Sequence, residues 1–186
     1  MKKLQFNKPF AIIAALLIVL CTSFIKSQIT FASFSNKAYD VYTNGYHDDG
    51  LSIKNDSMKK VSYAKNLVSI ASKYLKDDNP SILVLNQAIN SFDENRSISE
   101  EAHASTLLDG AFNELIAALN NQELTQKDSD YVLSFKADYD GRNDMIKRDK
   151  YHEYVLSLMN ETTNFPASFL YQFSHNKLEV FDGGIE

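Results

Sequence analysis

The segment FAIIAALLIVLCTSFI, residues 10–25, is a continuous apolar run behind a short N-terminus that carries three lysines. A helix needs about 20 apolar residues to cross the hydrocarbon core of a bilayer. Lys26 interrupts the run, but its long side chain can reach the headgroups while apolar residues as far as Phe34 continue the helix. The run therefore predicts a signal anchor, a transmembrane helix over residues 1–34.

A cleaved signal peptide is the alternative interpretation of the same run. Thr30-Phe31-Ala32 then provides an acceptable small-residue cleavage site, which would release the chain at Ser33. Because Cys21 to Ala32 is a long distance for the region before a cleavage site, we favour the uncleaved anchor. The basic residues ahead of the run predict a cytoplasmic N-terminus, so the protein is expected to be a single-pass cell-membrane protein with an extracytoplasmic body.

Cys21 is the one cysteine of the chain and ends the strictly apolar part of the segment, residues 10–21. A bacterial lipoprotein carries a small residue before its acceptor cysteine, whereas this chain has Leu20. Cys21 is therefore interpreted as an apolar membrane residue. The rest of the chain has no cysteine to form a disulfide, so its stability must come from packing.

Composition predicts a single all-α domain behind the anchor. The formal net charge is −5, and because residues 1–26 carry four lysines and no acid, the remainder carries −9. An acidic body disfavours nucleic acid as a partner. The chain has 6 Gly and 3 Pro among 186 residues, which is few for a β-rich or linker-rich protein.

Apolar residues at intervals of three and four predict helical structure over residues 58–92. Asp77-Asp78-Asn79-Pro80 interrupts it, where Asn79 can cap a second helix that begins at Pro80. The short interruption is compatible with one kinked rod or with a helical hairpin, and we favour the rod. The predicted core residues are Met58, Val61, Ala64, Leu67, Val68, Ile70, Ala71, Tyr74, Leu75, Ile82, Leu85, Ile89 and Phe92.

Ser97-Ile98-Ser99-Glu100 is a capping box that predicts the start of the next helix, which ends near Asn120-Asn121. A further helix is predicted over residues 128–164. The predicted seam of the first helix is Ala104, Leu108, Ala111, Phe112, Leu115, Ala118 and Leu119. The predicted heptad stripe of the second is Tyr131, Phe135, Asp138, Arg142, Met145, Asp149, His152, Leu156 and Met159.

The middle of this heptad stripe is polar. Its register turns Arg142, Asp149 and His152 inward, where each side chain needs a hydrogen-bonding partner. We expect them to pair with one another across a turn or with polar residues of a facing helix. Such a layer either sets the register of the helices or marks a groove for a partner or ligand.

Two carboxylate–histidine pairs, Glu100 with His103 and Asp149 with His152, have the spacing found in di-iron bundle proteins. Such a site also needs carboxylates from two further helices, and between residues 58 and 92 the acids lie only at the interruption. We therefore predict no metal, no cofactor and no catalytic residue. The chain also has no nucleophile elbow, zinc-protease motif or Gly-rich phosphate loop.

The segment RDKYHEYVLSLMNETTNFPASFLYQF, residues 148–173, resembles the closing signature of the LemA family. KNLVSIASKY, residues 65–74, is similar to an earlier stretch of that family, and the resemblance extends over residues 39–181. His152 and Leu158-Met159 replace residues of the family pattern. The positions that carry the resemblance are Asn66, Leu67, Val68, Tyr74, Arg148, Tyr151, Glu153, Val155, Phe165 and Pro166.

The resemblance implies an elongated antiparallel four-helix bundle of a bacterial cell envelope, with no established enzymatic activity. The expected organisation is an anchor over residues 1–34, a juxtamembrane segment over 35–56, a bundle over 57–173 and a tail over 174–186. The predicted function is an interaction or scaffold protein that contacts the lipid bilayer and an envelope protein partner. The alternative is a secreted or anchored bundle that binds a small ligand or a metal.

Overall fold

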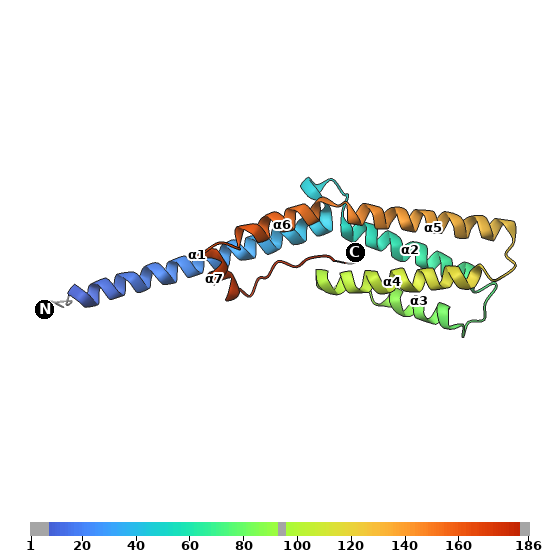
Figure 1. Ribbon diagram of the computed structural model, residues 1–186, viewed down its shortest axis with the longest axis horizontal. Helices are drawn as coiled ribbons and strands as arrows, with labels where there is room; N and C mark the ends of the chain where they lie inside the picture. Colours follow the sequence, from blue (N-terminus) through green and yellow to red (C-terminus); the bar gives the residue numbers. More distant parts are fainter. Residues whose placement is uncertain (1–7, 93–95, 183–186) are drawn as a thin grey trace. The chain divides into compact units, whose positions relative to one another are not determined.

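The computed structural model describes residues 8–92 and 96–182, and all regular structure within these ranges is helical, which confirms the all-α prediction (Figure 1). The lysines at positions 2 and 3, on which the predicted orientation partly depends, lie outside the described residues. The elements are α1 (Lys8–Asn44), η1 (Tyr46–Asp48), α2 (Ile53–Ala71), α3 (Pro80–Asn90), α4 (Ile98–Leu119), α5 (Gln126–Lys147), α6 (Lys150–Glu161) and α7 (Ala167–Gln172).

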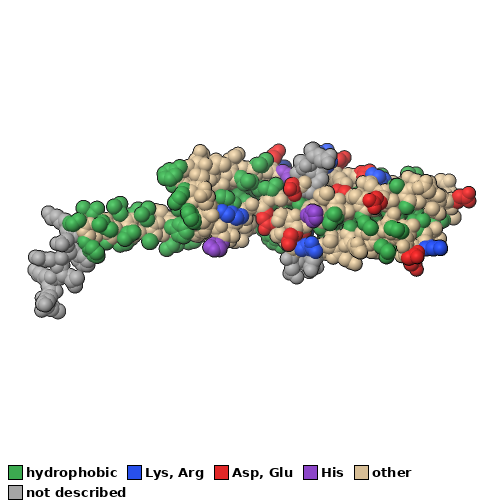
Figure 2. Space-filling model, turned by 60° about the horizontal axis from the view of Figure 1, so that its bottom comes forward, with side chains coloured by type: hydrophobic (Ala, Val, Ile, Leu, Met, Phe, Trp, Pro, Cys, Tyr) green, Lys and Arg blue, Asp and Glu red, His purple; other side chains and the backbone are tan. Residues whose placement is uncertain are grey.

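Helix α1 is the one helix of the described chain that is long and apolar enough to cross a membrane. An 18-residue window within Pro9–Asn44 has a mean hydropathy of 2.3, and none of that window is buried within the protein. Hydrophobic side chains cover most of the visible face of this part of α1 in Figure 2. Its large exposed apolar residues are Phe10, Ile12, Ile13, Leu16, Leu17, Ile18, Val19, Leu20, Phe24, Ile25 and Ile29.

The chain divides into two compact units. Unit 1 consists of Met1–Lys37 and Leu156–Leu178, and unit 2 consists of Ala38–Val155 and Glu179–Glu186. Within unit 1, Phe31 of α1 is buried, and its ring meets the ring of Tyr171 of α7 edge-on with a centroid distance of 5.1 Å. Helix α7 is therefore packed on the part of α1 that follows the apolar run.

Unit 2 has α2 as its central helix. This helix contacts α3, α4 and α5, and α3 also contacts α4. The chain reverses its direction at each connection from α2 to α5 (Figure 1). One hydrophobic core unites the four helices, and its buried members are Val61, Ala64, Leu67, Ile70, Ala71, Ile82, Leu85, Ala88, Ile89, Leu108, Ala111, Phe112, Leu115, Leu119, Val132 and Tyr139.

The kinked rod expected over residues 58–92 is wrong, because α2 and α3 form a helical hairpin. Helix α2 ends at Ala71, and a turn leads to Asn79, whose side chain accepts a hydrogen bond from the Ser81 amide at 3.0 Å. Pro80 is the first residue of α3, as predicted. Folding back buries the apolar stripe of α3 against α2 and α4, whereas a continuous rod would leave that stripe in water.

The predicted capping box is confirmed at the start of α4, and most of the predicted seam of this helix is buried. The predicted register of α2 is only partly right. Leu67 is fully buried, while Val68 is partly buried at the edge of the core and Met58 is 44% exposed. The centre of the buried face is therefore rotated from Val68 toward Leu67.

The single helix predicted over residues 128–164 is also wrong. Helix α5 ends at Lys147 and α6 begins at Lys150 after a short break. The predicted stripe fails with it, because Tyr131, Met145 and Leu156 are exposed. Neighbouring positions are buried instead, and these are Val132, Tyr139, Ile146, Tyr151 and Val155 in unit 2 and Leu158 in unit 1. The predicted face and the buried face of α5 both contain polar residues, so spacing alone did not show which face is buried.

Candidate functional site

A hollow of about 350 Å³ lies in unit 2 where two interruptions of the helices come together. One interruption is the loop between α1 and α2, and the other is the break between α5 and α6. We call this hollow the junction groove. It is lined by Tyr46, Asp49, Leu51, Asp56, Met145, Arg148, Asp149 and Lys150.

The loop that forms one wall of the groove depends on glycine. Gly45 has φ +88°, and a Cβ at this position would lie 2.3 Å from Asp49 Oδ1 and 2.5 Å from Leu51 O. The Asp49 carboxylate accepts a hydrogen bond from the Leu51 amide at 2.9 Å, and the Gly50 amide donates to Asn44 O at 3.0 Å. This tight turn displays Leu51 with 67% of its surface exposed.

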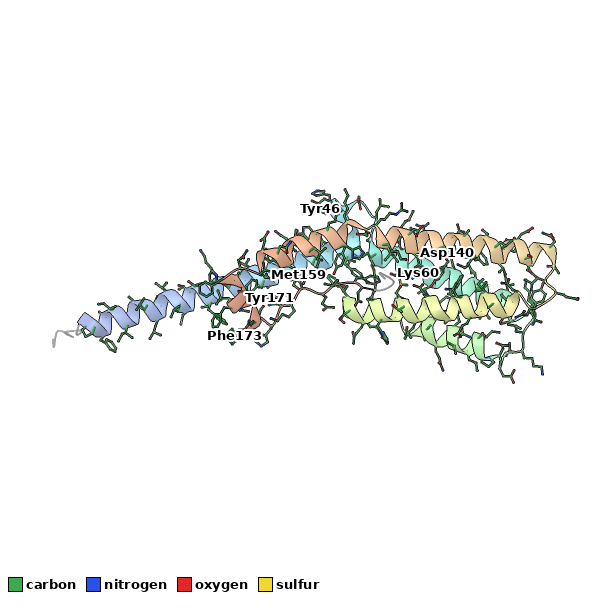
Figure 3. The ribbon with its side chains drawn as sticks, viewed as in Figure 1. Tyr46, Lys60, Asp140, Met159, Tyr171 and Phe173 are labelled. Carbon is green, nitrogen blue, oxygen red and sulfur yellow. The ribbon has the colours of Figure 1, made fainter. Side chains whose placement is uncertain are left out.

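Tyr46 supplies an aromatic side of the groove. Its ring centroid lies 4.1 Å from that of His47 and 6.0 Å from that of Tyr154. The Lys150 ammonium lies 5.3 Å from the same ring, within the range of a cation–π interaction. Figure 3 labels Tyr46 on the loop before α2. The ring is thus held by contacts with both interruptions.

One lining residue of the groove, Asp56, takes part in an ion pair between helices. Asp56 of α2 is buried, and its Oδ1 accepts a hydrogen bond from Arg142 Nη1 of α5 at 3.0 Å. Burial acts to lower the pKa of the Arg142 guanidinium, but hydrogen bonds to Asp56 and Tyr63 raise it, and the net shift is upward. Arg142 therefore remains charged and links α5 to α2.

The three residues of the predicted polar layer lie around the α5–α6 break, but each has a separate partner. Arg142 pairs with Asp56 on the facing helix, while Asp149 Oδ1 accepts the Tyr151 amide at 2.8 Å and so caps α6. His152 Nε2 lies 2.8 Å from the carbonyl oxygen of Ile146. Burial raises the pKa of Asp149, opposed by the hydrogen bond from Tyr151. A role of these residues in binding stays a prediction.

A buried lysine that sequence reasoning missed lies in the interior of unit 2. Lys60, labelled in Figure 3, is fully buried. Its Nζ lies 2.7 Å from Asp109 Oδ1 and 2.8 Å from Ser105 Oγ. Tyr139 donates a hydrogen bond to the same Asp109 oxygen at 2.6 Å. Burial lowers the pKa of Lys60 and raises that of Tyr139. The sequence signal that could have located this pair is a charged residue next to a predicted core residue on each of two helices, Lys60 next to Val61 and Asp109 next to Leu108.

A second buried carboxylate ties α4 to the end of α1 and the start of α2. Glu101 accepts hydrogen bonds from the Tyr42 hydroxyl and the Lys54 ammonium. Burial is the main cause that raises the pKa of Tyr42, and Glu101 adds to the shift. The Tyr42 ring also contacts the ring of Tyr151 with a centroid distance of 5.7 Å. Tyr42 and Glu101 are buried, while the Lys54 side chain is partly exposed, and together they link the three helices.

The residues considered for a metal have other roles. Glu100 accepts hydrogen bonds from the backbone and side chain of Ser97, and these bonds lower its pKa. His103 is exposed on α4. Within the described ranges, no three His, Cys, Asp or Glu side chains are grouped in a way that could hold a metal ion. The lining of the junction groove is aromatic, apolar and charged.

Comparison with known proteins found no relative of this chain. The chain matches no protein family, no curated protein and no solved structure. The resemblance to the LemA family stays a prediction. Of the positions that carry it, Tyr151 and Val155 are buried, while Phe165 is 83% exposed.

Proposed function

We propose that this protein is a non-catalytic, membrane-anchored binding protein that holds an envelope protein partner in its junction groove. In this proposal α1 spans the membrane with its N-terminus in the cytoplasm, and α2 to α5 form an antiparallel four-helix bundle outside. The length and apolar surface of α1 support the anchor. The LemA resemblance in the sequence supports the same type of protein, and membership of that family is part of the proposal.

The observation that carries the binding function is the composition of the groove. Protein interfaces are enriched in aromatic residues, Met and Arg, and their energetic centres are apolar pockets surrounded by polar groups. The groove combines Tyr46, Leu51 and Met145 with charged side chains of both signs. Leu51 and Met145 are exposed although both are apolar, so a partner that covered them would remove apolar surface from water.

The charges of the groove indicate what its partner must provide. Asp49 and Asp149 line the groove together with Arg148 and Lys150, so it offers charges of both signs to hydrogen-bonding groups of a polypeptide. An apolar side chain that enters between Leu51 and Met145, flanked by polar backbone, fits this arrangement. A nucleic acid does not fit it, because the body of the protein is acidic.

Site-specific photocrosslinking in intact cells tests the proposal. A benzophenone amino acid is placed in the full chain at Leu51, or at Leu133 of α5 as a matched control, since these side chains are 67% and 66% exposed. We expect one protein to be captured at Leu51 and not at Leu133, and its identification by mass spectrometry names the partner. Equal capture of the same proteins at both positions would contradict a specific groove.

A second function, binding of a small ligand, is favoured by the size of the hollow. A volume of about 350 Å³ lies within the range of small-molecule sites. Native mass spectrometry of protein extracted from its own membranes would then detect a ligand that Leu51→Asp releases. If no such mass accompanies the wild-type protein and photocrosslinking captures a protein at Leu51, binding of a protein partner is the function.

A further inference from the structure

Three large aromatic side chains in α7 and in the residues next to it are exposed. Phe165, Phe169 and Phe173 are 83%, 53% and 55% exposed. The rings of Phe169 and Phe173, one helical turn apart, meet edge-on with a centroid distance of 5.2 Å. We call these three residues the aromatic face. Figure 3 labels Phe173 and Tyr171 on this segment.

The segment that carries the aromatic face lies beside a defined stretch of α1. Tyr171 packs on Phe31 within unit 1. A shallow hollow of about 290 Å³ is shared by the two segments, and its lining includes Lys26, Thr30 and Phe34 from α1 together with Pro166 and Leu170. Helix α7 therefore lies beside residues 26–34 of α1.

The same stretch of α1 is where this helix must leave the hydrocarbon core. A helix rises 1.5 Å per residue, so a core about 30 Å thick takes about 20 residues. Counted from Phe10, this length ends near Ile29, and both Ile25 and Ile29 are exposed apolar residues. Residues 26–34, beside which α7 lies, thus begin within the hydrocarbon core and end outside it.

The polar residues around α7 suit a position among lipid headgroups. The Lys177 ammonium donates a hydrogen bond to Tyr171 O and lies 4.2 Å from the Tyr171 ring. Lys26 of α1 is exposed in the shared hollow. Interfacial segments of membrane proteins combine aromatic side chains directed toward the acyl chains with lysines directed toward phosphate groups.

We propose that the aromatic face inserts into the leaflet at which α1 emerges, as a second membrane contact of unit 1. This inference rests on the proposed function, because it requires that α1 spans the bilayer. The occupant is the lipid of that leaflet, since the face belongs to the same compact unit as the exposed apolar run of α1 and lies beside the residues at which that helix exits. A contact of this kind limits how far unit 1 can tilt or rotate about α1.

The absence of tryptophan from the sequence allows a direct test. Single-tryptophan variants of the full chain, Phe169→Trp and Phe173→Trp, are reconstituted into phosphatidylcholine vesicles that carry bromine either near the headgroups or near the chain ends. Leu133→Trp on α5 is the exposed control, and Ile18→Trp in the middle of the apolar run is the membrane control. Fluorescence quenching by each lipid is measured.

We expect bromine near the headgroups to quench Phe169→Trp and Phe173→Trp several-fold more than Leu133→Trp, and bromine near the chain ends to quench Ile18→Trp most. If Ile18→Trp is quenched but Phe169→Trp and Phe173→Trp behave like Leu133→Trp, the second contact is wrong and the anchor stands. If Ile18→Trp is not quenched, both proposals fail. Emission at short wavelength without quenching would show that protein covers the face, for example a second copy of the chain, and would overturn lipid insertion.

Discussion

Lys60 brings a positive charge into the interior of unit 2, and its surroundings are arranged to keep that charge. The Asp109 carboxylate lies 2.7 Å from the ammonium, Ser105 accepts a hydrogen bond, and the Tyr139 ring lies 5.1 Å away. A buried ion pair contributes little net stability compared with apolar residues of similar size, but removal of one partner is costly. Three helices contribute to this cluster, so its loss affects α2, α4 and α5 together.

Asp109→Ala is therefore expected to destabilise the protein by about 3 kcal/mol, because Lys60 loses its counter-charge while it remains buried. The value is at the low end of the usual range because the Asp109 side chain is 22% exposed. Urea unfolding in detergent followed by circular dichroism measures the change. The double variant Lys60→Met/Asp109→Leu should recover most of the loss, and a double variant no more stable than Asp109→Ala would contradict this account.

The lowered pKa of Asp128 should make the stability of the protein depend on pH. Hydrogen bonds from Lys73 at 2.8 Å and from Tyr74 at 2.5 Å lower its pKa. A carboxyl whose pKa is lower in the folded state stabilises the protein above its unfolded pKa of about 3.9, and the contribution is lost as the pH falls through the folded pKa. Asp128→Asn should thus lower Tm at pH 7 and lower it less below about pH 3.

Thermal melts at the two pH values test this prediction, with Asp138→Asn on the exposed side of α5 as the control. The control should change Tm little at either pH. A loss of Tm in Asp128→Asn that is the same at both pH values would indicate lost packing at the start of α5 rather than loss of the charged hydrogen bonds.

At the level of helices, the two breaks decide which side chains are buried. The turn after Ala71 lets α3 return along α2 and α4, and the break after Lys147 lets α6 begin with its own phase. Asp149 stabilises the second break by accepting the Tyr151 amide, as side-chain caps do at helix starts. The predicted continuous helices failed at these two places, where a side-chain cap starts a new helix.

Leu67 and Val68 test the register of α2 directly. Leu67 is fully buried in the shared core, whereas Val68 is packed at its edge. Leu67→Asp should destabilise unit 2 by several kcal/mol, on the order of the stability of a whole domain, because the carboxylate would be buried without a partner. Val68→Asp should cost clearly less, since its carboxylate can reach water. Melting midpoints of the two variants compare the costs, and equal losses would place the buried face elsewhere.

For the whole molecule, the proposed function assigns α1 the role of membrane anchor. Its apolar side chains are exposed all along the residues 10–25 run, and in water this surface would drive aggregation. A bilayer removes that cost, because lipid covers the side chains and the helix satisfies its own backbone hydrogen bonds. The junction groove would then present its partner at a membrane surface, as the proposed function requires.

Cys21 reports on this arrangement because no other thiol is present. A charged, membrane-impermeant maleimide should leave Cys21 unlabelled in intact cells and label it after detergent is added. In a Cys21→Ser background, Ser134→Cys on the exposed surface of α5 should be labelled in intact cells, which tests the extracytoplasmic position of unit 2. Labelling is followed by a gel shift. Rapid labelling of Cys21 without detergent, or none of Ser134→Cys, would contradict the proposed topology.

The sequence by itself determined the features that depend on neighbours within a few turns. The apolar run at 10–25, the capping box at Ser97 and the helix start at Asn79-Pro80 all appear in the structure. Each depends on local hydrogen bonds or on the composition of one helix, so spacing and residue type were sufficient to predict them.

Only the tertiary structure decided the features that join distant parts of the chain. The pairs Lys60–Asp109 and Arg142–Asp56 link different helices, and the junction groove combines the loop before α2 with the break before α6. Helical periodicity does not distinguish between two neighbouring faces of a helix when both contain polar residues, as in α5. The choice between them came from the facing helices, which bury one phase, pair its charges and leave the other phase in water.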